Sequence, residues 1–241
     1  MPYIKRTCRA GKTKNFCFYY SPRYHPPGEK REQQGSVTSE AQKKVNRRLA
    51  ERTLTELMNA NFSDNDLYIT WHYKKECRPD GKEELRTQIR KLLRKLRNLY
   101  KKAEKVLKYI WVAEVGKRGA AHIHMVLTGY ENIKALQSLW TYGHINVQPL
   151  DSSGQYRKLA EYFIKYSDVT INTDQELQGK RYNCSRNLIR PIARVRPVTY
   201  KKRYSQNIKI PTGYYLDKGS VREGINDITG YSFFCYTIVK T

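Results

Sequence analysis

The chain is 241 residues long, with 46 lysines and arginines against 22 aspartates and glutamates and a formal net charge of +24. No apolar run approaches the ~18 residues of a membrane-spanning helix, and the basic N-terminus lacks the apolar segment of a signal peptide. Because so much like charge opposes compaction, we expect a polyanionic partner, with nucleic acid favoured over a membrane surface.

The cysteines are scattered, odd in number and form no C-x-x-C pair. They are Cys8, Cys17, Cys77, Cys184 and Cys235. Reduced thiols in a cytoplasm fit this pattern better than a disulfide framework or a structural zinc site. We therefore expect a cytoplasmic protein.

Residues 1–38 are basic and rich in turn formers, which predicts a loosely packed N-terminal arm. Within this segment, Gly11-Lys12-Thr13 resembles the end of a phosphate-binding loop. Such a loop needs a glycine five residues before Gly11, where the chain has Arg6, and no apolar strand leads into it. We therefore expect neither an ATPase nor a nucleotide cofactor.

Apolar periodicity predicts alternating helices and strands from residue 39 to residue 170. The predicted helices span 39–60, 82–108, 131–140 and 155–168. The predicted strands span 67–73, 107–115, 121–128 and 143–147. A turn at 116–119 makes a hairpin, so we expect an α+β fold with a central, mainly antiparallel sheet and flanking helices. Residues 171–241 would form a basic C-terminal extension that packs on or near this 39–170 core.

Two basic segments are candidates for holding nucleic acid. Residues 82–108 contain 11 Lys/Arg and 3 Glu, and residues 178–205 contain 9 Lys/Arg, no acidic residue and interleaved tyrosines. Charges for phosphates and rings for bases suit a single strand. A solvated helix face and a flexible basic linker are the alternatives. The candidate DNA-binding residues are Arg181, Tyr182, Arg186, Arg190, Arg194 and Arg196.

His122-Ile123-His124 lies inside the second strand of the predicted hairpin. Side chains alternate across a strand, so both imidazoles point to one face. If the loop centres on Arg118, Glu114 lies opposite His122 on the same face. Two imidazoles and a carboxylate form a three-ligand site suited to Mg²⁺ or Mn²⁺. Ordinary half-buried histidines are the alternative.

The last predicted helix places Tyr162 and Lys165 on one face, at i and i+3. A phenol is a poor nucleophile at its usual pKa near 10, but nearby lysine charge and a metal favour the phenolate. Tyr162 is thus a candidate for attack on a phosphodiester. An ordinary surface tyrosine is the alternative.

The order of these motifs resembles that of the HUH endonucleases, and more narrowly of the rolling-circle replication initiators of plasmids, integrative elements and filamentous-type phages. The resemblance covers about residues 60–170. Leu67–Tyr73 is loosely similar to the first motif of this family. Glu114 with His122-Ile123-His124 is similar to the metal motif, and Tyr162-Phe163-Ile164-Lys165 is similar to the catalytic helix.

The resemblance implies an RNA-recognition-like sheet and a metal-dependent nickase that acts on single-stranded or hairpin origin DNA. Glu114, His122 and His124 would hold the Mg²⁺ or Mn²⁺ ion, Tyr162 would attack, and Lys165 would assist. The products would be a 5′-phosphotyrosine and a 3′-OH that primes rolling-circle replication, before a later transfer rejoins the strands. A host helicase and DNA polymerase would act with it in a bacterial cytoplasm.

The resemblance has departures. Lys158 stands where some initiators carry a second tyrosine, which favours a single nucleophile, and Tyr166 offers another hydroxyl. His72 stands where the first motif commonly has threonine. Tyr162 follows the histidines, which favours an initiator over a mobilisation relaxase. A single-tyrosine transposase or relaxase of this class and a non-catalytic basic nucleic-acid-binding protein are the alternatives.

Overall fold

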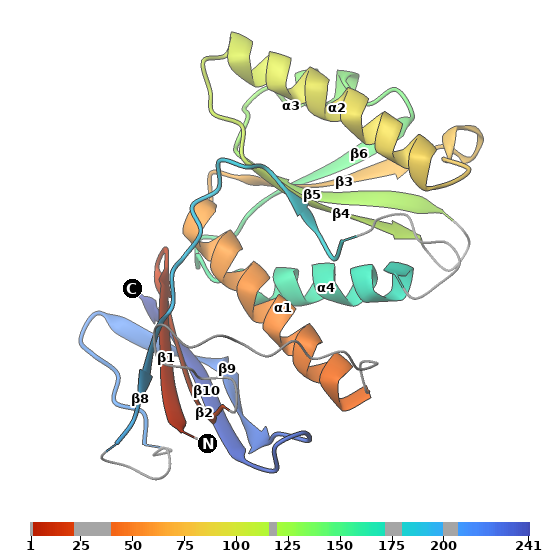
Figure 1. Ribbon diagram of the computed structural model, residues 1–241. Helices are drawn as coiled ribbons and strands as arrows, with labels where there is room; N and C mark the ends of the chain where they lie inside the picture. The colour runs from red at the N-terminus through yellow and green to blue at the C-terminus, as the bar shows by residue number, and fades with distance from the viewer. Residues whose placement is uncertain (1, 22–39, 116–119, 172–179, 200–206) are drawn as a thin grey trace. The chain divides into compact units, whose positions relative to one another are not determined.

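The computed structural model describes residues 2–21, 40–115, 120–171, 180–199 and 207–241. The chain divides into two compact units (Figure 1). The central unit is Asn61–Ile189, and the terminal unit combines Met1–Ala60 with Arg190–Thr241. Each unit has a five-stranded sheet whose pairings are antiparallel, so the predicted α+β class is confirmed, with two sheets in place of one.

The central unit is built on a sheet with the strand order β6-β3-β5-β4-β7. Its strands are β3 (Leu67–Tyr73), β4 (Tyr109–Val115), β5 (Ala121–Leu127), β6 (Gly143–Pro149) and β7 (Asn183–Cys184). Its helices are α2 (Lys82–Lys102), α3 (Ile133–Ser138) and α4 (Arg157–Ile171), with a 3-10 turn, η1, at Lys75–Cys77. The sequence predicted these elements except β7 and η1, and the largest difference is that α2 ends at Lys102.

Helices cover both faces of the central sheet (Figure 1). On one face, α2 and α3 pack on the main hydrophobic core, where Trp71 and Ile123 join Leu92 and Leu96. On the other face, Phe163 of α4 contacts Tyr68 of β3, with ring centroids 6.2 Å apart. Because side chains alternate along each strand, the polar residues between the core positions all point toward α4.

The terminal unit joins both ends of the chain in one sheet, with the strand order β8-β1-β2-β10-β9. Its strands are β1 (Tyr3–Ala10), β2 (Thr13–Tyr20), β8 (Arg194–Pro197), β9 (Tyr214–Ile225) and β10 (Ser232–Lys240). Helix α1 (Glu40–Asn61) packs on one face of this sheet. A single core therefore depends on segments that are far apart in the sequence.

Polar contacts hold α1 on this sheet. Arg6 of β1 donates two hydrogen bonds to the Glu56 carboxylate, at 2.6 and 2.7 Å, and both side chains are largely buried. Asn59 donates to Thr13 Oγ1 at 3.0 Å. At the β1–β2 turn, Gly11 has φ 54, and a Cβ there would lie 2.0 Å from the Asn59 carbonyl oxygen. Only glycine fits this turn beneath the helix.

The prediction of a loosely packed N-terminal arm was wrong for Tyr3–Tyr20, which form the hairpin β1–β2. β2 lies at the centre of the sheet, between β1 and β10. The segment Gly11-Lys12-Thr13, which resembles a phosphate-binding loop, makes the hairpin turn. Basic residues stand on both faces of β1, with Arg6 on the side of α1 and Lys5 and Arg9 on the other, so the strand period is not apparent in the sequence. The rest of the predicted arm, residues 22–38, lies outside the described residues.

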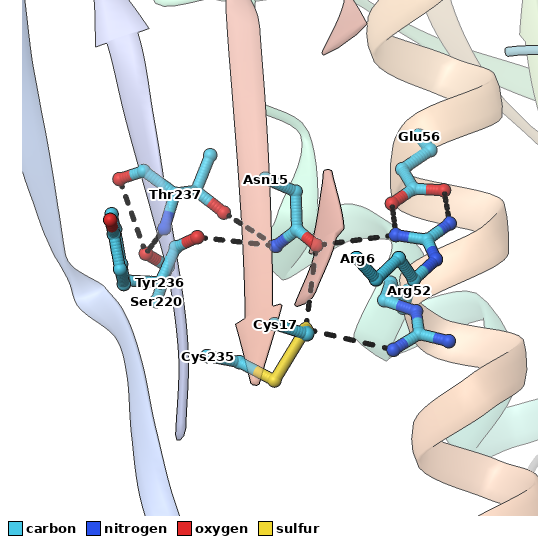
Figure 2. The surroundings of a disulfide bond; sticks show 9 residues. All are labelled: Arg6, Asn15, Cys17, Arg52, Glu56, Ser220, Cys235, Tyr236 and Thr237. Carbon is cyan, nitrogen blue, oxygen red and sulfur yellow. Dashed lines mark hydrogen bonds and ion pairs between the residues drawn. A yellow bond between two sulfur atoms is a disulfide. The ribbon is translucent and has the colours of Figure 1, made fainter. Parts of the chain in front are cut away.

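The prediction that all cysteines are reduced thiols was also wrong. Cys17 of β2 and Cys235 of β10 are directly paired across the sheet, with Cα atoms 4.2 Å apart, and form a disulfide (Figure 2). Cys8, Cys77 and Cys184 form no disulfide in the described part of the chain. The sequence separation of 218 residues explains why spacing gave no signal of this pair.

Among the described residues, no helix combines the length and the apolar character needed to cross a membrane.

Candidate active site

Strands β3, β4 and β5 bring polar side chains together on the face that α4 covers. His122 and His124 of β5 share this face, as the strand period predicted. Glu114 of β4 lies directly opposite His122, which is the register expected from the hairpin. Thr70 of β3 pairs with His124 from the other side. The two imidazoles and the carboxylate therefore share one patch of the sheet.

His124 is the centre of the hydrogen bonding on this patch, and it is buried. Its Nε2 lies 2.8 Å from Glu114 Oε2. Its Nδ1 lies 2.8 Å from the Tyr68 hydroxyl and 3.3 Å from Thr70 Oγ1. A carboxylate only accepts, so this pattern assigns a proton to Nε2 and makes Nδ1 the acceptor from Tyr68. The ring is therefore oriented from both sides.

Tyr162 reaches the same histidine from α4. Its hydroxyl lies 3.4 Å from His124 Nε2, and the two rings meet edge to face with centroids 5.2 Å apart. Its neighbours on the helix, Phe163 and Ile164, are fully buried, so the apolar side of α4 fixes where Tyr162 points. The structure thus brings Tyr162, which the sequence singled out as a nucleophile, together with Glu114 and His124, which it singled out as metal ligands.

Lys165 lies on the same helix as Tyr162. Its side chain is exposed, and its Nζ lies 5.6 Å from the centroid of the Tyr166 ring. Tyr166 in turn packs against Tyr162, with centroids 4.4 Å apart. The assisting role of Lys165 stays a prediction.

The protein's own side chains keep Tyr162 protonated. Burial raises the pKa of its phenol well above the ordinary value, and neighbouring Tyr68 and Glu114 raise it further. Burial also raises the pKa of Tyr68. The expectation that lysine charge and a metal favour the phenolate stays a prediction, because the described surroundings of Tyr162 raise this pKa. An additional positive charge is needed to activate this phenol.

A second group of imidazoles extends the patch across the sheet. His72 of β3 pairs in register with His122 of β5 and with His144 of β6. The ring centroid of His72 lies 4.8 Å from that of His122 and 4.5 Å from that of His144, and the His72 and His144 rings are stacked. Their alignment depends on the strand order, which the sequence pattern does not contain.

Burial keeps two of these imidazoles neutral. Burial, with the neighbouring His122 and His144, lowers the pKa of His72 to about 4. Burial and His124 also lower the pKa of His122. Only a neutral imidazole donates a lone pair to a metal, so His122 is available as a ligand at neutral pH.

The donor chemistry of the patch fits a divalent cation. Imidazole nitrogen with carboxylate oxygen is a donor set that Mn²⁺ or Mg²⁺ accepts. His124 Nε2 and Glu114 Oε2 are 2.8 Å apart, close enough for both atoms to ligate one ion once the proton between them leaves. His122 shares the face, with its ring centroid 6.4 Å from that of His124. In the described ranges, no three His, Cys, Asp or Glu side chains are already gathered around a common metal position.

The six candidate DNA-binding residues fall in two separate places. Arg181, Tyr182 and Arg186 flank β7, which pairs with β4 of the central sheet. Arg190 begins the C-terminal part of the terminal unit, and Arg194 and Arg196 lie on its edge strand β8. The described part of the 178–205 segment therefore contributes to both units.

The basic segment at 82–108, a candidate for holding nucleic acid, contributes helix α2 to one face of the central sheet. The apolar side of α2 packs on the sheet face that carries Trp71 and Ile123. Tyr162 and His124 lie on the opposite face, under α4. The charges of α2 therefore lie on the wrong side of the sheet to present a phosphate to Tyr162.

The sequence of the strands and the helix that form this site matches a known family. The model of the family described as "Replication-associated protein ORF2/G2P" matches residues 66–170. This segment is similar to that family. The match runs from the start of β3 almost to the end of α4 and includes Glu114, His122, His124 and Tyr162. Neither a curated protein nor a solved structure matches the chain.

The match supports a replication-associated protein and agrees with the resemblance to rolling-circle initiators. The match lies inside the central unit, which holds the candidate site. The terminal unit lies outside the match. Any role of the terminal unit must therefore be argued from its own residues.

Proposed function

We propose that this replication-associated protein nicks single-stranded or hairpin origin DNA through Tyr162. The Tyr162 oxygen forms a bond to the scissile phosphorus, and the bond from phosphorus to the 3′ oxygen breaks. The phenol proton is in net terms transferred to that 3′ oxygen. The products are a 5′-phosphotyrosine and a free 3′-OH. The 3′-OH primes rolling-circle replication by a host polymerase with a host helicase, and reversal of the same step rejoins a strand.

The observation that carries this proposal is the contact of Tyr162 with His124. The hydroxyl lies 3.4 Å from Nε2, the nitrogen that also lies 2.8 Å from Glu114. A nucleophile and a set of cation ligands thus converge on one buried histidine. The alternative is an ordinary surface tyrosine, and such a residue is not expected to contact a buried histidine.

A Mg²⁺ or Mn²⁺ ion held by Glu114, His122 and His124 would supply positive charge at the scissile phosphate and would lower the pKa of the neighbouring phenol. The protein side chains perform the remaining tasks. Glu114 orients His124 from one side, and Tyr68 orients the same imidazole from the other side. Phe163 and Ile164 anchor the helix that carries Tyr162. Lys165, which is exposed on that helix, would assist through its positive charge at the phosphate backbone of the DNA.

The test uses the full chain, Mn²⁺ and a single-stranded oligonucleotide that covers the origin of the source element. We expect an adduct between protein and DNA that survives denaturation in detergent. Tyr162→Phe should abolish it while DNA binding persists, because the ring and its packing remain. Tyr166→Phe is the matched variant, one helical turn away, and should retain the adduct.

Two results would overturn the proposal. An adduct that survives Tyr162→Phe but is lost in Tyr166→Phe would move the nucleophile to Tyr166. Absence of any adduct on origin DNA, with binding intact, would favour a non-catalytic nucleic-acid-binding protein. A chelator should abolish the adduct, and Mn²⁺ or Mg²⁺ should restore it.

A further inference from the structure

One face of the terminal sheet has no role in the proposed nicking reaction. The opposite face packs on α1 through Arg6 and Cys17, as Figure 2 shows. Alternation along β1 and β2 therefore directs Lys5, Lys14 and Phe16 away from α1. We use the name aromatic–cationic face for residues on this side of β8, β1, β2 and β10. The name covers eight of the residues on this side, which are Lys5, Arg9, Lys14, Phe16, Phe18, Arg194, Arg196 and Tyr236.

Lysines lie over aromatic rings on this face. Lys5 Nζ lies 5.6 Å from the centroids of both Phe16 and Phe18. Lys14 Nζ lies 5.2 Å from the centroid of Phe16, and Phe16 stacks with Tyr236 at 5.0 Å. The rings are half-buried, so part of each ring is accessible to a ligand. Cations and rings thus alternate across neighbouring strands.

The edge strand β8 adds further positive charge. Arg196 is directly paired with Lys5, and Arg194 is directly paired with Thr7, so both arginines share the face. Both are exposed. In the described part of the chain, none of the salt bridges involves Lys5, Lys14 or either arginine. Their charge is available to a partner.

The sign of the charge changes across this face of the sheet, from the β8 edge to the β9 edge. Glu223 of β9 pairs with Phe234 and so lies on the same side of the sheet, at the edge away from β8. Positive charge therefore gathers over β8, β1 and β2, and the aromatic rings lie on β2 and β10. An anion that also offers flat apolar surfaces fits this pattern better than an acidic peptide does.

We propose that the aromatic–cationic face binds single-stranded DNA at a second site, outside the family-matched segment. Unpaired bases stack on the rings of Phe16, Phe18 and Tyr236, and phosphates contact Lys5, Lys14 and the β8 arginines. A duplex hides its base faces, so the rings select single strands. That the strand is DNA and not RNA rests on the proposed function.

The experiment measures binding of a fluorescein-labelled oligothymidylate of about 16 nucleotides. The protein is the full chain carrying Tyr162→Phe, so that no cleavage interferes. Phe16→Leu with Phe18→Leu removes the rings but keeps apolar bulk. We expect this pair to weaken binding of the single strand about tenfold or more, with little effect on binding of a duplex of the same length.

Charge is tested separately. Lys5→Gln with Lys14→Gln should reduce the slope of log affinity against log salt by about 1.4, which is about 0.7 for each phosphate that a lysine no longer neutralises. Lys43→Gln with Lys44→Gln, on α1, is the matched control and should leave the slope unchanged. Equal reductions of the slope in the Lys5/Lys14 variant and the Lys43/Lys44 variant would overturn the proposal, because binding would then depend on overall positive charge and not on this face.

The ring variants could unfold the sheet, so a measurement on the unaltered protein is also needed. Photo-crosslinking to an oligonucleotide that contains 5-iododeoxyuridine should modify peptides bearing Phe16, Phe18 or Tyr236. Crosslinks confined to the central unit would overturn the proposal. Tighter binding of oligouridylate than of oligothymidylate would overturn the assignment to DNA.

The second site and the nicking proposal fail in different ways. If no adduct forms on origin DNA but the ring variants lose binding of oligothymidylate, the nicking proposal fails and the face still binds a single strand. If the adduct forms and the ring variants bind as the parent does, the second site fails alone.

Discussion

The Tyr162 hydroxyl and the His124 Nε2 lie 3.4 Å apart, and the same nitrogen lies 2.8 Å from Glu114. One imidazole atom therefore faces both the proposed nucleophile and a carboxylate ligand. His124 must give up the proton on this nitrogen before it can ligate a metal. Metal binding and the environment of the nucleophile are thus linked through a single atom, which leads to predictions for the residues around it.

Glu114→Gln should weaken metal binding. Glutamine keeps the size of the side chain but removes the negative charge that favours a divalent cation. We expect the affinity for Mn²⁺, measured by isothermal titration calorimetry, to fall at least about tenfold. Glu161→Gln is the matched control, because Glu161 pairs with Arg157 along the surface of α4. Equal Mn²⁺ affinity in the two variants would remove Glu114 from the ligand set.

Tyr68→Phe should weaken metal binding indirectly, because Tyr68 contacts His124 and is not itself a proposed ligand. The variant loses the hydroxyl that donates to Nδ1 at 2.8 Å, so the imidazole is less firmly oriented. We expect the Mn²⁺ concentration for half-maximal adduct formation to rise about tenfold, with most of the rate recovered at saturating metal. Tyr130→Phe, in the same unit, serves as the control. An unchanged metal dependence would show that Tyr68 is only a packing residue.

Stability should fall on acidification because of His72. Its pKa is lowered to about 4 in the folded protein, whereas the unfolded chain takes up this proton near 6.5. Between these values the unfolded state binds more protons, so the free energy of unfolding decreases as pH falls through this window. The Tm of the parent should therefore drop more steeply from pH 7 to pH 4.5 than the Tm of His72→Gln. Parallel Tm curves would contradict a neutral, buried His72.

The lowered pKa of His122 changes the expected pH dependence of metal binding. An unperturbed histidine would lose its ligand form as pH falls through about 6.5. Because burial lowers the pKa of His122, we expect Mn²⁺ binding to persist to a lower pH than that. Calorimetric titrations with Mn²⁺ at pH 7, 6 and 5 test this. Loss of binding already complete at pH 6 would contradict it.

Reduction of the Cys17–Cys235 disulfide should destabilise the terminal unit. The bond joins β2 to β10 across 218 residues of sequence, and closing so long a loop restricts the unfolded chain. We expect a loss of about 2–4 kcal/mol in the free energy of unfolding when a reductant is added. Cys17→Ser with Cys235→Ser should be insensitive to the reductant. Detection of five free thiols in the denatured, unreduced protein would contradict the bond.

Much of the central unit follows from local pattern. Alternation within Ala121–Leu127 places His122 and His124 on one face, and the short hairpin brings Glu114 opposite His122. The apolar stripe of α4 determines that Tyr162 lies beside the buried Phe163. These relationships involve residues close in sequence or one hairpin apart, where the periods of strand and helix leave little freedom.

Other features depend on pairings that no local pattern contains. The order of the strands aligns His72 with His122 and His144, and decides that α2 lies on the face away from Tyr162. The same kind of long-range pairing places β2 beside β10 and makes a disulfide from two cysteines that look unrelated in the sequence.

The sequence by itself determined the elements of the central unit, the faces of its strands and helices, and the excess of positive charge. Tertiary structure decided where that charge lies and which distant strands become neighbours. The physical reason is that periodicity reports which side of an element is buried, whereas the partner that buries it is selected by packing over the whole chain. The aromatic–cationic face follows from such packing, because α1 covers one side of the terminal sheet and leaves Lys5, Phe16 and their neighbours on the other.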